Sequence, residues 1–155
     1  MAVNARFSTG LELLTLLALA PEKAHPSQTL AASMETNAVV VRRLLVTLHA
    51  AKLVTSVKGP SGGSKLSRSP RQITLGDIYR ALEPGEIFHA GSTKTAKNKP
   101  LSEAMQTVFR KSRRALEKEL DSVKLHQFAK KVGKKSAKAE EKKAAPKLPA
   151  NAVKA

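Results

Sequence analysis

A chain of 155 residues favours a single domain with an appended segment, and a net charge of +16 favours a polyanionic partner, nucleic acid before a membrane surface. Aromatic residues make up only 3% of the chain, too few for the base stacking that RNA and single-strand binders use, so the composition favours duplex DNA. The chain contains no Cys, which excludes disulfides, cysteine-ligated clusters and thiol redox sensing.

The first helix is expected from Thr9 to Leu19, ended by Pro21. Its apolar run is similar to a signal peptide, but Glu12 interrupts the run, and the Thr9–Glu12 spacing is that of a capping box that begins a folded helix. Leucines cover most of its circumference, which predicts either a central core helix or a helix shared with a partner subunit. No other run approaches the roughly 20 apolar residues of a membrane span, so we expect no membrane contact and a cytoplasmic protein.

Two short helical patterns follow, separated by residues 35–37. Ser27 is expected to cap the first helix, and Thr36 or Asn37 the second, which ends near Lys52. Apolar residues of the second helix recur at i, i+3, i+4 and i+7, and they predict one core stripe, formed by Val41, Leu44, Leu45 and Leu48. The remaining N-terminal side of this helix carries Asn37, Val39, Val40, Arg42 and Arg43.

This N-terminal side has the residue types that read base edges in a helix-turn-helix. Asn pairs with adenine, Arg forks onto guanine and Val contacts the thymine methyl group. The two valines are equally well explained as packing residues. For Arg42 and Arg43, which lie opposite the core stripe, we expect DNA contact rather than a solvated face.

A strand-like run at residues 53–58, a Gly-Pro-Ser-Gly-Gly turn and a second run at residues 64–67 predict a two-stranded ribbon. A helix pair followed by such a ribbon is the outline of a winged helix-turn-helix, whose second helix enters the DNA major groove. The lysines that flank the turn are expected to meet phosphates or enter the minor groove. The predicted DNA-contacting residues are Ser27, Thr29, Thr36, Asn37, Val39, Val40, Arg42, Arg43, Lys58, Gly59, Pro60, Ser61, Gly62, Gly63 and Lys65.

A fourth helix is expected over residues 74–82, with Thr74 and Asp77 as its capping box, and it completes a DNA-binding domain of residues 1–83. Residues 84–100 form a polar loop. Residues 101–129 hold a long amphipathic helix and a short terminal helix. The long helix is expected to be a dimerisation arm rather than an intramolecular packing helix, because the preceding unit has its own core. Its apolar stripe consists of Leu101, Met105, Val108, Phe109, Leu116 and Leu120.

The C-terminal tail, residues 130–155, is rich in Lys and Ala and holds nine Lys against two Glu, a net charge of +7. It has almost no large apolar residues, so we expect it to be disordered and to attract DNA without regard to sequence. A purely solubilising tail is the alternative. The expected fold class is mainly α with a small β-wing: a winged helix-turn-helix domain plus a long C-terminal dimerisation helix.

Residues 6–128 resemble the Rrf-type bacterial transcription regulators, the group that includes IscR, NsrR and CymR. The resemblance is carried by the RFST opening, the LAASMETNAVVVRRLLVTLHAAKLVTSV helix pair, the KGPSGG wing, the ITLGDIYRALE helix and the AMQTVFRKSRRALEKELDSVKL arm. The TNAVVVRRLL segment is most similar to the YwnA-type branch.

The resemblance implies a homodimeric winged-helix repressor or activator on a near-palindromic operator. By position, it implies a wing contact at Lys58 and base contacts at Asn37, Val39, Val40 and Arg42. Cluster-binding members often carry Glu where Arg42 stands, so their operator preference is not expected here. Those members also place three cysteines between the fourth helix and the arm, where this chain reads EIFHAGSTKTAKNKP. We therefore expect no iron–sulfur cluster, no metal at His89 and no other cofactor.

The predicted function is sequence-specific regulation of transcription by a homodimer, most simply a repressor, associated with the nucleoid. An architectural protein that coats DNA and a protein–protein adaptor derived from a regulator are the alternatives. No nucleophile–base pair, carboxylate pair or metal constellation in the sequence supports an enzyme. A space between the arm and the fourth helix would suit a small-molecule effector, which the residues do not name.

Overall fold

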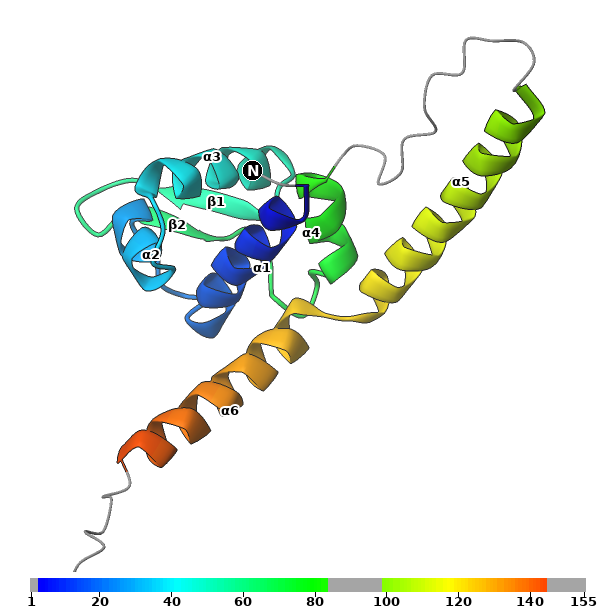
Figure 1. Cartoon of the computed structure of the whole chain (residues 1–155). Coiled ribbons are helices and arrows are strands. Elements are labelled where there is room, and N and C mark those ends of the chain that lie inside the picture. The colour runs from blue at the N-terminus through cyan, green and yellow to red at the C-terminus, as the bar shows by residue number, and fades with distance from the viewer. Residues whose placement is uncertain (1–2, 84–98, 145–155) are drawn as a thin grey trace, which may run out of the picture.

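The computed structural model describes residues 3–83 and 99–144 of the chain (Figure 1). These residues form six helices and one two-stranded antiparallel sheet, so the predicted fold class, mainly helical with a small β-wing, is confirmed. In chain order the elements are α1 (Val3–Leu19), α2 (Ser27–Ser33), α3 (Ala38–Ala50), β1 (Val54–Val57), β2 (Gly63–Leu66), α4 (Leu75–Leu82), α5 (Lys99–Ser122) and α6 (Leu125–Ala144).

One core lies where α1, α3, α4 and the sheet meet. The predicted core stripe of α3 is confirmed, because all four of its members are buried. Opposite them, α1 contributes three leucines that are almost fully buried, and α4 contributes Ile78 and Leu82. Each such side chain stabilises the fold by roughly 1.5–3 kcal/mol relative to an exposed one. This core holds α3 with one face inward and the other free.

The first helix begins earlier than the sequence pattern predicts. It already includes Val3, and Thr9 lies inside it, where its hydroxyl donates a hydrogen bond to the carbonyl oxygen of Ala5 at 2.7 Å. The predicted capping box of Thr9 and Glu12 is therefore wrong. A second side of α1 packs against α6 of the same chain, and this contact favours a central core helix over one shared with a partner.

The helices α2 and α3 are joined by a tight turn in which Glu35 adopts a φ of 47°. Of the two predicted caps of α3, Asn37 is the one observed, because its side-chain oxygen accepts a hydrogen bond from the backbone N–H of Val39 at 2.8 Å. The predicted Ser27 cap is wrong. Ser27 is the first residue within α2, and the cap position is Pro26, which makes no side-chain hydrogen bond.

The two strands of the wing pair in register from Val54 opposite Leu66 to Val57 opposite Gly63. At the base of the wing, Ser64 exchanges two backbone hydrogen bonds with His25, each 2.9 Å long. Gly63 permits this close approach, since its φ is 154° and a Cβ atom there would lie 2.4 Å from the His25 carbonyl. The wing is therefore tied to the turn between α1 and α2.

Helix α5 extends away from the core, whereas α6 begins against it, with Leu125 and Ala129 buried (Figure 1). The terminal helix is longer than predicted, because α6 continues to Ala144. The prediction of disorder is therefore wrong for residues 130–144. The last two residues of the predicted loop, Lys99 and Pro100, belong to α5. The rest of that loop, including His89, and the end of the predicted tail lie outside the described residues. Among the helices that are described, none is long and apolar enough to span a membrane.

Candidate nucleic-acid interface

The exposed face of α3 is the centre of the candidate site. Because the core stripe fixes one side of the helix inward, the residues three and four positions apart on the other side point to solvent. Four exposed side chains define this reading face: Val39, Arg42, Arg43 and Val46. Val46 is 71% exposed and Val39 47%, unusually high values for valines in a helix of this core. The reading face thus combines the guanidinium groups of two arginines with the methyl groups of two valines.

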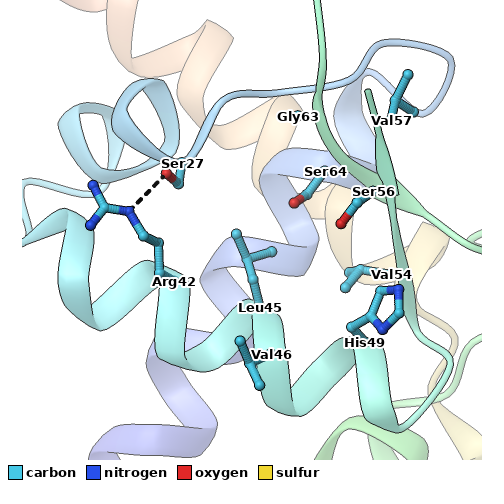
Figure 2. Close-up of a pocket in the computed structure, with 10 residues that line it drawn as sticks. All are labelled: Ser27, Arg42, Leu45, Val46, His49, Val54, Ser56, Val57, Gly63 and Ser64. Carbon is cyan, nitrogen blue, oxygen red and sulfur yellow. Dashed lines mark hydrogen bonds between the residues drawn. The ribbon is translucent and has the colours of Figure 1, made fainter. Parts of the chain in front are cut away.

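Arg42 is oriented by a contact from α2. Its Nε donates a hydrogen bond to the Ser27 hydroxyl oxygen at 3.4 Å (Figure 2). Within the described part of the chain, Arg42 makes no other hydrogen bond and no ion pair, so its two terminal nitrogens are free. A guanidinium held in this way can fork onto the O6 and N7 atoms of guanine or onto a phosphate.

A groove of about 540 Å³ runs between α3 and the wing (Figure 2). Arg42, Val46 and His49 line it from α3, and Ser56 and Val57 line it from β1. Val57 is 38% exposed, so apolar groups stand on both walls. The groove therefore presents a guanidinium group, several hydrogen-bonding side chains and several aliphatic side chains to a single ligand surface.

The tip of the wing is a glycine-rich turn closed by a hydrogen bond from the Gly62 N–H to the Gly59 carbonyl oxygen at 2.9 Å. Gly59 has a φ of 110°, a conformation that favours glycine. Lys58, Pro60 and Ser61 are exposed around it. Among the described residues Lys58 has no carboxylate partner, so its ammonium is available to a phosphate.

The structure brings only part of the predicted set together. Val40 is half-buried and packs against the core, and the Asn37 oxygen is already engaged as the cap of α3. Lys65 follows Ser64 on β2, so the two side chains point to opposite faces of the ribbon. Ser64 lines the groove, while Lys65 lines a different cavity. Lys65 is therefore separated from the reading face.

Sequence reasoning missed several residues of the groove: Val46, His49, Ser56 and Val57. The spacing of Val39, Arg42 and Val46, at i, i+3 and i+7, puts them on one face of a helix and could have identified Val46. No such signal exists for the wing residues. Which face of a short ribbon turns toward α3 depends on packing that the sequence does not show.

The long helix α5 carries an apolar stripe that the described chain leaves largely exposed. It has no buried residue, and Leu101 and Val108 are 58% and 57% exposed. Met105 and Leu116 are exposed beside them, and the other two predicted members, Phe109 and Leu120, are half-buried.

The junction between α5 and α6 is clamped onto α4. Backbone N–H groups of Leu75 and Leu125 donate to the carbonyl oxygens of Val123 and Ile73 at 3.0 and 2.9 Å. The predicted capping box of α4 is confirmed, and its Thr74 hydroxyl also donates to Asp121 at 3.1 Å. A Cβ atom on Gly76 would lie 2.0 Å from an Asp121 oxygen, so glycine is needed for this approach.

Charged hydrogen bonds reinforce the junction. Arg80 donates to both carboxylate oxygens of Asp121, at 3.0 and 2.9 Å, and to Asp77 at 3.0 Å. The hydrogen bond from Arg80 lowers the pKa of Asp121 and, conversely, raises that of Arg80. Burial raises the pKa of Asp77, but hydrogen bonds from Thr74 and Arg80 and the charge of Arg68 outweigh it, so the net pKa is lowered.

Replacing Asp121 by Asn is expected to lower the free energy of unfolding at pH 7 by about 1 kcal/mol, since both ion-pair partners are partly exposed and screened. The wild-type pKa is lowered from 3.8, so this contribution is complete above that pH and is lost as pH falls through the folded pKa. Urea unfolding followed by circular dichroism at pH 7 and at successively lower pH measures the difference. Glu119→Gln, which removes an exposed charge nearby, is the control. Equal destabilisation by both variants would contradict the role of the pair.

The described residues contain no group of three or more His, Asp or Glu side chains that could hold a metal ion. The whole sequence also lacks Cys, so no thiolate ligand is available anywhere in the chain. The residues present therefore do not fit a cysteine-ligated iron–sulfur cluster.

The helix pair α2–α3, with α3 as its reading helix, and the wing that follows define a winged helix-turn-helix protein. The chain belongs to the Rrf2 family: a family model described as an iron-dependent transcriptional regulator matches residues 3–131. It is therefore a transcriptional regulator of a family that is not enzymatic, which confirms the predictions of the family and of a non-enzyme.

The chain is similar to several members of this family. It is 32% identical over 127 residues to YwnA of Bacillus subtilis, which is named as an HTH-type transcriptional regulator, and the match covers 79% of this chain and 93% of YwnA. The structure of CymR, the global cysteine regulator of B. subtilis, has a TM-score of 0.61 at 26% identity and covers 81% of this chain and 93% of CymR. IscR of T. potens has a TM-score of 0.62 at 25% identity, with coverage of 92% and 90%.

Proposed function

We propose that this regulator is a homodimeric repressor that reads a near-palindromic operator with α3 and steadies the flanking backbone with its wing. The observation that carries the proposal is the reading face of α3. There the terminal nitrogens of Arg42, which make no hydrogen bond within the described chain, lie beside exposed valines at the edge of the groove. Residues of this kind on this helix suit direct readout in the major groove. Lys58 at the wing tip would contribute a phosphate contact that does not depend on sequence.

The proposed dimer forms through α5. An exposed apolar stripe on a 24-residue helix, in a chain with a complete core of its own, suits a second copy of the same helix. A two-fold axis through this contact would place two reading faces on the two half-sites.

Control by a cysteine-ligated cluster does not apply to this chain, because it has no Cys. We infer that its signal is of another kind. The lysines of α6, of which Lys130, Lys131, Lys134 and Lys135 are exposed, would add salt-dependent attraction to DNA in the cytoplasm.

Isolating the genomic fragments that bind the full-length protein tests the proposed function. We expect the bound fragments to share a palindrome, and we expect a duplex carrying it to outcompete random duplex of equal length by about a thousandfold at physiological salt. An architectural protein would show almost no preference in the same competition. That result would refute the specific readout.

Val46→Ala is expected to weaken operator binding about fourfold, because one apolar contact with a thymine methyl is lost. The matched measurement replaces operator thymines by uracil, one position at a time, which removes only the methyl group. One replacement should weaken the wild type and leave Val46→Ala unchanged, as read by fluorescence anisotropy. If every uracil operator affects both proteins equally, Val46 does not contact a methyl group.

A further inference from the structure

A second cavity, of about 510 Å³, lies on the other side of the wing from the groove. Three segments that are distant in sequence form it: the turn after α1, the end of β2 with the link to α4, and the beginning of α6. Its volume is in the range of small-molecule sites. Its polar and charged lining residues include Glu22, Lys65, Arg68, Ser69, Arg71 and His126.

The charge of this cavity is positive. Three cationic side chains line it against a single carboxylate, that of Glu22. Arg68 is partly neutralised, because it donates to Asp77 at 3.0 Å. Lys65 and Arg71 have no carboxylate partner in the part of the chain that the structure describes. Cationic groups without partners around one hollow favour an anionic ligand.

His126 forms part of one wall of the cavity. Its Nδ1 is buried and has no hydrogen-bond partner among the described residues. Its backbone N–H donates to the carbonyl oxygen of Pro70 at 3.1 Å, so this end of α6 is fixed to the link that also carries Ser69 and Arg71.

The cavity is separate from the proposed DNA surface. None of the residues that line it also lines the groove beside α3. Ser64 and Lys65 mark the division, since these neighbours on β2 face the groove and the cavity respectively. In Figure 1, α3 lies along the upper edge of the body, whereas α6 begins at its lower edge. A duplex on α3 therefore leaves the cavity open to another anion.

We propose that this cavity binds a small phosphate monoester, with Lys65, Arg68 and Arg71 as the cationic contacts and the Ser69 hydroxyl as a further donor. A phosphate presents three acceptor oxygens, which suits two guanidinium groups and an ammonium better than a single carboxylate does. All four contacts belong to one segment, from the end of β2 into the link to α4, so the phosphate would hold this segment from the side opposite the groove.

Binding there has a route to the DNA surface. The turn after α1 is joined to β2 by the two hydrogen bonds between His25 and Ser64, and Ser64 lines the groove. Lys65, a proposed phosphate contact, is the neighbour of Ser64 on β2, so an anion that shifts Lys65 shifts the wing and the strand end held by His25. Any change of operator affinity must then be matched by an equal change of phosphate affinity. This regulatory step rests on the proposed function, whereas the binding step does not.

The binding step is tested on the full-length protein without DNA. Inorganic phosphate is titrated at constant ionic strength, and ¹H–¹⁵N spectra report on the amides of the cavity. We expect saturable shifts at Ser69, Arg71 and His126.

Arg71→Gln should weaken phosphate binding about tenfold. Arg43→Gln, which removes the same charge from the reading face, should leave it unchanged. Arg71 is exposed, so the variant is expected to fold, and Lys65→Gln provides an independent second variant.

Four results would overturn the proposal. Shifts that do not saturate, or equal losses in Arg71→Gln and Arg43→Gln, would mean general screening. Succinate binding as tightly as phosphate would mean that the site selects carboxylates. Displacement of phosphate by a short random duplex would mean that the cavity belongs to the DNA interface. Failure to find an operator would leave the phosphate titration valid and would refute only the regulatory step.

Discussion

Val108→Glu is expected to convert the proposed dimer to a monomer and to weaken binding to the proposed two-half-site operator on the order of a hundredfold. Val108 is 57% exposed in the middle of the apolar stripe of α5. In the proposed dimer the partner helix covers this position. A carboxylate there would lose its hydration without gaining a cationic partner, or would face the same carboxylate of the second copy. A monomer would bind only one half-site. It would lose the high effective concentration at which a dimer already bound to one half-site meets the other.

Sedimentation velocity measures the mass, and fluorescence anisotropy measures the operator affinity. Thr107→Glu is the matched control, because it introduces the same charge at the neighbouring position, roughly on the opposite face of the helix. Thr107 is exposed and its hydroxyl bonds only to the backbone of Glu103. The dimerisation role of α5 is refuted if both variants remain dimers, or if both become monomers.

Arg42→Ala is expected to weaken operator binding by roughly 1–3 kcal/mol, or about 5- to 160-fold, and unequally across operator variants. The Ser27 hydroxyl orients the guanidinium, and its free nitrogens can form a bidentate contact with one base. Binding to random duplex should change far less. A set of operators with single base-pair changes, titrated by anisotropy, identifies the base pair that Arg42 reads.

Lys58→Ala gives the contrast. Lys58 lies at the tip of the wing, so we expect its loss to weaken all sequences alike and to reduce the salt slope by about one. Together, the two variants separate sequence-specific base contacts from sequence-independent attraction to the phosphates. If Arg42→Ala lowers specific and random binding equally, the base-reading role of α3 is wrong.

The parts of this fold that the sequence predicts are those with short-range causes. The stripe of α3 follows from helical spacing, the Asn37 cap from its amide, and the capping box of α4 from the Thr74–Asp77 spacing. The start of α1 could not be predicted in this way, because Thr9 fits a cap as well as it fits the interior of a helix. Local patterns of this kind leave two solutions, and packing selects one.

Long-range contacts account for the remaining differences. Arg80 and Asp121 are 41 residues apart, and nothing local pairs them. The first half of α6 is stabilised by contact with α1, which a composition of Lys and Ala does not reveal. The same reason applies to Lys65: its charge suggests a DNA contact, but strand alternation in the folded wing turns it toward the second cavity.

The clamp at the junction of α5 and α6 has a consequence for the length of the operator. Two backbone hydrogen bonds and the Arg80–Asp121 pair join the arm to the body that carries α3, so the angle between dimer axis and reading helix is set by a braced joint. Adding one base pair between half-sites rotates the second by about a tenth of a turn of the duplex. A braced joint cannot follow that rotation freely. In the proposed dimer, the spacing of the operator is thus encoded in α4 and the junction, far from any residue that touches a base.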